Sequence, residues 1–323
     1  KVIKLSIPRT LTLSAHQIAS FFLIAFASLM AGGSISVFNL AFNLQSVPLA
    51  IIGVSYSTAA FPALSRFFAR GEKDNFLRQM IVSTRHIMFW SLPITALFVI
   101  LRAQIVRVIY GAGNFDWTDT RLTAAVLAFF MISVTGQSLI LLFVRSYYAE
   151  GKTSRPLFIN LISATSIVLF GYGLTRLFDI APTFRYFLEA LMRIGNTGSE
   201  VVVLPLAFTL GAIINTILHW VVFERDYPGF TAGVRRNLFQ SFSTACIMGY
   251  VTYRALAVFD HVFSLTTVAG VFLQGFCAGI VGIIIGILVL VALKNEEIKE
   301  VWATLHRKIW KAKVAPAELE HIV

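Results

Sequence analysis

The stretch TTVAGVFLQGFCAGIVGIIIGILVLVAL, residues 266–293, decides the fold because it contains no charged side chain along its whole length. About 20 apolar residues in a helix are enough to cross the hydrocarbon core of a bilayer, so this stretch predicts a membrane-spanning helix. Its glycines recur at the spacing of a helix-packing face, which indicates a buried contact with another helix. These glycines are Gly275, Gly279, Gly282 and Gly286.

Seven further apolar stretches precede this one, and together they predict an all-α polytopic membrane protein with about eight transmembrane helices. The composition agrees, because 57% of the residues are hydrophobic and 13% are charged. Soluble domains carry about 25% charged residues, so a soluble enzyme and a soluble nucleic-acid binder are both excluded. The seven stretches are 8–31, 34–65, 82–101, 120–149, 156–178, 199–223 and 238–258.

The basic residues predict the orientation of these helices. Of the 27 lysines and arginines, 19 fall at the two ends of the chain and in every second loop. The positive-inside rule therefore places both ends of the chain in the cytoplasm, and we expect a bacterial cytoplasmic (inner) membrane protein. The net charge of +11 then indicates contact with anionic membrane lipids, with no nucleic acid as partner.

Two stretches are too short or too charged to cross the membrane and predict helices that lie at its surface. One is 102–112, and the other belongs to the tail 294–323, which we expect to be a cytoplasmic, amphipathic and basic segment. The tail should contribute surface affinity only. The apolar stripe of the tail consists of Ile298, Trp302, Leu305 and Ile309.

The spans lack the side chains that covalent chemistry needs. All 16 acidic residues flank spans or lie in the tail, and no HExxH motif or paired acid occurs within a span. Cys246 and Cys277 lack metal-ligand spacing and are interpreted as small core residues. The sequence therefore predicts no catalytic residue, no metal site and no cofactor, and the protein is not expected to be an enzyme.

Uncharged polar residues in the first two spans are the candidates for a site. Asn39, Asn43 and Ser46 share one helical face, and two polar residues of the first span are four positions apart with a glutamine beside them. They either hold helices together or line a wet cavity that meets a polar head group. The candidate substrate-binding residues are His16, Gln17, Ser20, Asn39, Asn43 and Ser46.

Arg145 is the only basic residue well inside a span. It lies six residues before Gly151, so its guanidinium group could reach the cytoplasmic surface or pair with a structural partner. The alternative is contact with a phosphate or carboxylate group of a substrate.

Three strings, taken in order, resemble signatures of the MurJ (MviN) family of lipid II flippases. The run SVFNLAFNLQSVPLAIIGVSYSTAAFPALSRFFARG (36–71) resembles the eighth helix of that family. YGAGNFDWTDTRLTAAVLAFF (110–130), followed by VRSYYAEGKTSRP (144–156), is similar to the next signature, and LPLAFTLGAIINTIL (204–218) is similar to the twelfth helix. Arg145 matches an arginine that is common before the turn in the second string, which favours a structural role near a cytoplasmic gate.

The resemblance implies a member of the multidrug/oligosaccharidyl-lipid/polysaccharide (MOP) exporter superfamily, whose two six-helix lobes enclose a central cavity. Residues 1–223 would form the C-terminal lobe and 224–293 two additional helices with a lipid-tail groove. The partners implied are the N-terminal lobe, which is absent from this chain, and lipid II, a polyprenyl-pyrophosphate-linked peptidoglycan precursor. The function implied is lipid II flipping by alternating access for cell-wall synthesis.

Two alternatives to this function stay open. One is a flippase for another polyprenyl-linked glycan, or a drug exporter of the same superfamily. The other is a non-transporting membrane scaffold for cell-wall enzymes. The chain departs from the family where the eighth helix often reads YADR, since the matching residues are Leu40, Ala41, Phe42 and Asn43. The family's ion-binding positions in the seventh and eleventh helices match Leu23, Ile167 and Gly171, so the resemblance carries no ion site to these positions.

Overall fold

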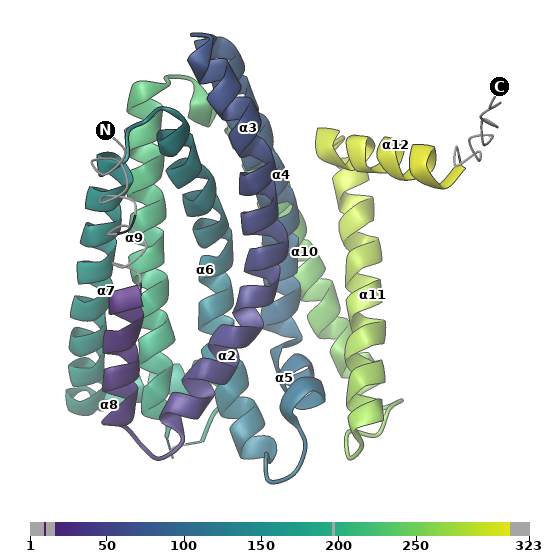
Figure 1. The fold of residues 1–323 in the computed structure, drawn as a ribbon. Coiled ribbons are helices and arrows are strands. Elements are labelled where there is room, and N and C mark those ends of the chain that lie inside the picture. The colour runs from purple at the N-terminus through teal and green to yellow at the C-terminus, as the bar shows by residue number, and fades with distance from the viewer. Residues whose placement is uncertain (1–9, 11–16, 196–197, 311–323) are drawn as a thin grey trace, which may run out of the picture.

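The computed structural model of the chain describes residue 10, residues 17–195 and residues 198–310, with side chains as far as residue 303. Every regular element in these ranges is a helix, which confirms the predicted all-α class (Figure 1). After a helix at Gln17–Ser28, the elements are α2 (Ser34–Pro48), η1 (Leu49–Val54), α3 (Ser55–Ala69), α4 (Lys73–Ile100), α5 (Arg102–Tyr110), α6 (Trp117–Ala149), α7 (Ser154–Ile180), α8 (Pro182–Met192), η2 (Ser199–Val202), α9 (Val203–Asp226), α10 (Phe230–Phe259), α11 (Val268–Ala292) and α12 (Glu296–Trp310).

Within the described residues, six helical stretches are long and apolar enough to cross a membrane. The bent pair of α4 and α5 makes a seventh when it is counted as one span. The first expected span, 8–31, is represented by Gln17–Ser28, which is too short to cross a bilayer alone, and residues 11–16 lie outside the described part. The chain is therefore a multi-pass membrane protein, and seven of the eight predicted spans are found in the predicted order when α4 and α5 are counted as one.

The second span is one continuous helical stretch from Ser34 to Ala69 with a change of winding in the middle. Pro48 ends α2, and the six residues of η1 that follow form a π-helix. Proline removes a backbone donor, and π segments occur frequently at functional sites. The sequence analysis did not predict this π-helical turn.

Two short helices lie between the spans. The stretch 102–112, expected at the membrane surface, forms α5, which turns by 74° from the axis of α4. The stretch 179–198, for which the sequence predicted no conformation, contains α8, which starts with Pro182 at a favoured helix position. Tyr186 and Phe187 of α8 are exposed while Leu188 is buried, so α8 has an apolar surface beyond its contact with the lobe.

The helix α6 lies at the centre of the lobe. In its most apolar stretch of 18 residues, 72% is buried. It packs against α2, α3, α4, α5 and α9, and its aromatic residues belong to two apolar cores. In one core Phe130 contacts Phe38 of α2 and Phe208 of α9 edge to face, with ring centroids 5.2 and 5.4 Å apart. In the other, Phe143 contacts Phe223 of α9. A single helix thus joins both halves of the lobe.

The last two spans pack on the α4–α5 side of the lobe. The helix α10 runs along α4, and α11 packs on α10 and α5 (Figure 1). The glycine face of α11 makes these contacts: a Cβ atom on Gly286 would lie 2.9 Å from Sδ of Met248, and one on Gly275 would lie 3.0 Å from Cβ of Gln104. The predicted packing role of the glycine pairs is confirmed.

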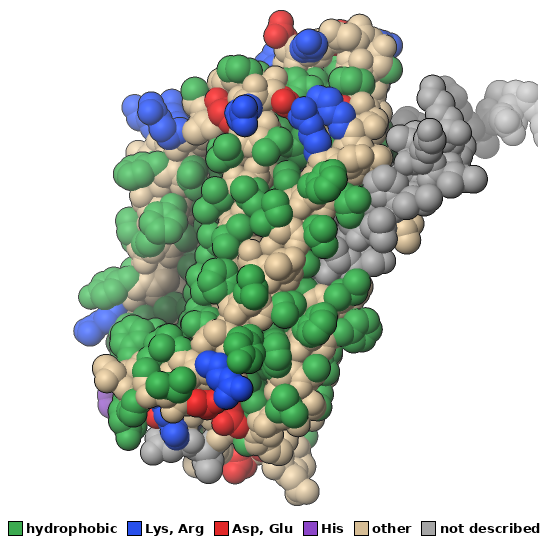
Figure 2. Space-filling view, turned by 90° about the vertical axis from the view of Figure 1, so that its left-hand side faces the viewer, with side chains coloured by type: hydrophobic (Ala, Val, Ile, Leu, Met, Phe, Trp, Pro, Cys, Tyr) green, Lys and Arg blue, Asp and Glu red, His purple; other side chains and the backbone are tan. Residues whose placement is uncertain are grey.

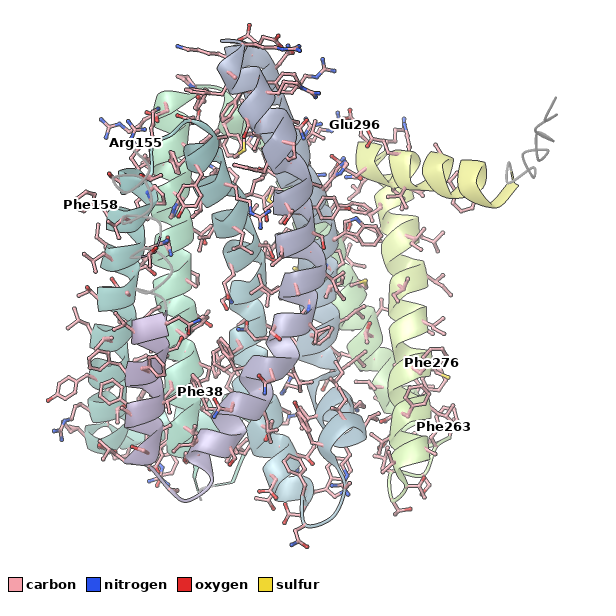
Figure 3. The ribbon with its side chains drawn as sticks, in the orientation of Figure 1. Phe38, Arg155, Phe158, Phe263, Phe276 and Glu296 are labelled. Atoms are coloured by element: carbon pink, nitrogen blue, oxygen red, sulfur yellow. The ribbon has the colours of Figure 1, made fainter. Side chains whose placement is uncertain are left out.

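The outer surface has the pattern of a membrane-embedded protein. Figure 2 shows hydrophobic side chains along the middle of the molecule and Lys, Arg, Asp and Glu gathered toward its two ends. Phe158, Leu169 and Ile180 of α7 are more than 60% exposed, which suits contact with lipid chains. In Figure 3, Arg155 and Glu296 lie at one end, and Phe263 lies toward the other.

Candidate functional site

The helix α2 has two chemically different faces. Its buried face, led by Val37, Phe38 and Ala41, packs into the apolar core of the lobe. Asn39, Asn43 and Ser46 are all exposed on the opposite face, as their shared spacing predicted. The lobe therefore leaves a polar face uncovered on the first part of the membrane-spanning stretch Ser34–Ala69.

The same polar character continues past the π-helix. Ser55 and Thr58 of α3 are exposed, and their hydroxyl groups donate to the backbone carbonyls of Ala50 and Val54 at 3.3 and 2.6 Å. Hydroxyl groups that bond within their own helix avoid the cost of an unpaired polar group in an apolar setting. The outer side of this span thus carries polar groups on α2 and α3, with exposed apolar residues such as Ile51 and Val54 between them.

Of the first-span candidates, Gln17 does not join this face. Gln17 lines a separate cavity inside the lobe, of about 870 Å³, to which Asn39, Asn43 and Ser46 contribute nothing. Ser20 is half-buried, and His16 lies outside the described residues. The six predicted residues therefore fall in at least two places.

The cavity brings together polar residues that the sequence analysis did not single out. Asn160 and Ser163 of α7, Gln137 of α6 and Asn215 of α9 line it. Nδ2 of Asn215 donates to Oδ1 of Asn160 at 2.9 Å. The signal was available, because uncharged amides inside apolar spans must find partners, and the reasoning applied to Asn39 holds equally for these helices.

The positions aligned with the family's ion ligands lie together in an apolar contact. Leu23 and Ile167 are 0% and 2% exposed. A Cβ atom on Gly171 would lie 3.1 Å from Cδ2 of Leu23. Residues far apart in the sequence thus meet where the resemblance expects them to meet, but with hydrocarbon side chains in place of oxygen ligands.

Charged residues join the end of α6 to the end of α9. The Glu150 side chain is fully buried, and a carboxylate oxygen lies 2.5 Å from Nζ of Lys152. Lys152 is also 3.5 Å from a carboxylate oxygen of Asp226, which pairs with Arg155. Arg145, one to two turns before this cluster on α6, is half-buried. The turn between α6 and α7 is therefore fixed by charge pairs.

Tyr227 borders this ion cluster. Burial raises the pKa of the Tyr227 phenol, and the neighbouring Glu150 carboxylate raises it further. The phenol is therefore neutral at physiological pH and adds no third negative charge beside Glu150 and Asp226.

A second polar cluster joins the start of the tail to α4. Arg85 donates from Nε and Nη2 to the carbonyl oxygen of Gly233 at 2.9 and 2.7 Å, and its Nη1 lies 3.1 Å from a carboxylate oxygen of Glu296. Nδ2 of Asn295, a fully buried residue, donates to Oε1 of Gln240 at 2.8 Å. The first residues of the tail are thus packed against the bundle and do more than contact the membrane surface.

A family model described as "Lipid II flippase MurJ" matches residues 1–274 of the chain. The chain belongs to this family. A probable lipid II flippase MurJ of Bdellovibrio bacteriovorus is 27% identical over 233 residues, covering 72% of this chain and 40% of that protein. One of Thermotoga maritima is 29% identical over 160 residues, covering 49% of this chain and 33% of that protein.

Solved structures show the same fold. A lipid II flippase MurJ in an inward closed conformation matches 94% of this chain and 54% of its own, with a TM-score of 0.64 and 21% identity. An outward-facing multidrug resistance MATE family transporter of the MOP superfamily matches 95% of this chain and 68% of its own, with a TM-score of 0.56 and 12% identity. The chain therefore has a MOP-type fold and covers between 33% and 54% of the length of these MurJ proteins.

Proposed function

We propose that this chain is the C-terminal portion of a lipid II flippase that moves its polyprenyl-pyrophosphate-linked substrate across the cytoplasmic membrane by alternating access. The family membership supports this proposal, and the exposed polar face of α2 carries it. A polar face on a membrane-spanning helix is tolerated only against protein or water. An N-terminal lobe opposite α2 would enclose that water.

In this proposal Asn39, Asn43 and Ser46 line the wall of the central cavity. Their amide and hydroxyl groups would bond the sugar and pyrophosphate oxygens without the cost of burying a charge. Residues 1–223 form the lobe, and α10 and α11 hold the lipid tail within 224–293. The lobes rock about the head group, and no covalent bond forms or breaks, so no catalytic residue takes part.

Arg145 is assigned to the cytoplasmic gate. It lies on α6 close to the Glu150–Lys152 ion pair, at the end where the basic loops gather. By the positive-inside rule that end, with both ends of the chain, faces the cytoplasm of the bacterial cell. Arg145→Gln is expected to slow translocation, while Arg145→Lys retains most of it.

The test is translocation of fluorescent lipid II by the intact protein in proteoliposomes, read as label that becomes accessible to an external quencher. The expected result is faster translocation than in protein-free vesicles, with competition by unlabelled lipid II. Stronger competition by another polyprenyl-linked glycan or by a drug would indicate that the protein transports that class of molecule in place of lipid II. A rate equal to that of empty vesicles would contradict transport and favour the scaffold alternative.

A further inference from the structure

The helix Gln17–Ser28, η1, α6, α7 and α9 line the partly open cavity of the lobe, which the proposed flipping mechanism does not use. Its volume of about 870 Å³ lies within the range of small-molecule sites. No charged side chain is among its lining residues in the described part of the chain. The apolar part of the lining is Ile18, Phe21, Leu49, Val54, Ile140, Leu141, Val144, Ala164, Ile167, Phe208 and Ala212.

One polar pair stands out on this apolar wall. Asn215 is only 8% exposed, and its Nδ2 donates to Oδ1 of Asn160. Oδ1 of Asn215 is buried and accepts no hydrogen bond from the residues that the structure describes. A buried acceptor without a donor costs about 1–3 kcal/mol, so such groups in native proteins normally have a partner, and a cavity beside the group offers room for one.

The bond between the two amides fixes what this partner must offer. Oδ1 of Asn160 accepts from Asn215, so Nδ2 of Asn160 is the group of this pair that can donate and Oδ1 of Asn215 the group that can accept. A hydroxyl group suits this pair, because it donates one hydrogen bond and accepts another. A charged group does not suit it, because no opposite charge lines the wall and burying an unpaired charge is costly.

We propose that this cavity binds a neutral long-chain alcohol from the membrane. Its hydroxyl group donates to Oδ1 of Asn215 and accepts from Nδ2 of Asn160, while its hydrocarbon chain packs against Leu141, Val144 and Phe208. Exposed apolar side chains at the rim, Ile18 and Phe21, offer such a molecule an apolar route from the bilayer. The proposal is independent of flipping, since it uses none of the polar face of α2.

The experiment uses a dodecanol analogue with a photoreactive diazirine, added to the intact protein in lipid nanodiscs. After irradiation, peptide mass spectrometry locates the adducts. We expect adducts on the cavity stretches of α6 and α9, lost when unlabelled dodecanol is in excess. Asn215→Leu should lower this labelling about fivefold, the equivalent of one hydrogen bond of roughly 1 kcal/mol.

Two further variants keep the result interpretable if Asn215→Leu fails to fold. Val144→Phe adds bulk at a half-buried wall position and should also reduce the labelling. Asn43→Leu removes an asparagine of the same lobe that does not line the cavity, and its labelling should equal that of the unaltered protein. Adducts confined to lipid-facing residues such as Phe158, or cavity adducts unchanged in Asn215→Leu and Val144→Phe, would overturn the proposal.

Discussion

Gly53 of η1 lies directly against the backbone of Ser138 in α6. A Cβ atom on Gly53 would stand 2.9 Å from Cα of Ser138 and 2.8 Å from its Oγ. The hydroxyl group could rotate away, but the backbone atom cannot. The π-helical turn after Pro48 thus lies where the two spans pack backbone to backbone.

Gly53→Ala is expected to destabilise the protein by about 1–3 kcal/mol, because the added methyl group overpacks this contact. Gly173→Ala is the matched control, since Gly173 also lies in a membrane-spanning helix but has nothing within 4 Å of its Cβ position. Thermal unfolding in detergent measures both. Equal melting temperatures for the two variants would show that the helices separate without cost.

Lys152→Ala is expected to destabilise the turn between α6 and α7 by about 1–3 kcal/mol, because it leaves the buried Glu150 carboxylate without its closest countercharge, while the 39% exposure of the Lys152 side chain lets water screen part of the pair. Adding Glu150→Gln should restore much of the lost stability, since the double variant no longer has an uncompensated buried charge. Arg70→Ala is the control, because Nη1 of Arg70 lies 3.9 Å from a carboxylate oxygen of Glu72 in a largely exposed pair. Such surface pairs contribute about 0–1 kcal/mol to the free energy of unfolding. The melting temperature is the readout, and no rescue in the double variant would contradict this assignment.

Asn295→Ala is expected to cost about 1–3 kcal/mol, because Oε1 of Gln240 loses its donor in a buried position. Lys299→Ala, at an exposed position of α12, should leave stability unchanged. If both variants unfold at the temperature of the unaltered protein, the start of the tail is not part of the packed bundle.

Much of this fold could be predicted from the sequence, because apolar stretches long enough to cross a bilayer admit few structures other than helices. Residues 268–292 are one example, and the glycine face of α11 is another. The π-helical turn at Leu49–Val54 and the helix α8 could not be predicted, since both depend on packing against other spans. The buried contact of Asn295 was also not predicted, because it depends on Gln240, which lies 55 residues earlier in the sequence.

The candidate site was predictable only in part. The exposed face of α2 follows from the spacing of Asn39 and Asn43. The pairing of Asn160 with Asn215 does not, because it depends on how α7 lies along α9, and local spacing carries no such information.

Cysteines placed in opposite loops should be labelled from opposite sides of the membrane. In a Cys246→Ser, Cys277→Ser background, Asn75→Cys and Ser154→Cys are expected to react only from the cytoplasm. Asn114→Cys and Ser264→Cys should react only from outside, because the basic residues gather at the other end. An impermeant maleimide on intact cells and on inverted vesicles measures this. Labelling of Asn75→Cys on intact cells would reverse the topology.

The last prediction concerns Asn43 on the exposed face of α2. In the intact protein, Asn43→Cys should react with an impermeant thiol reagent, because a water-filled cavity would reach this face. Asn43→Leu should reduce lipid II translocation while expression stays near that of the unaltered protein. Val47→Leu is the control, since Val47 is exposed on α2 but carries no polar group.

The size of the loss separates two roles for Asn43. Hydrogen bonds between helices in membranes average about 0.6 kcal/mol, which corresponds to roughly a threefold effect. A larger loss of transport in Asn43→Leu indicates direct contact with the charged head group. An unreactive cysteine together with a fully active leucine variant would mean that α2 packs dry against its neighbour. A reactive cysteine with a fully active leucine variant would keep the wet cavity but remove Asn43 from the substrate site.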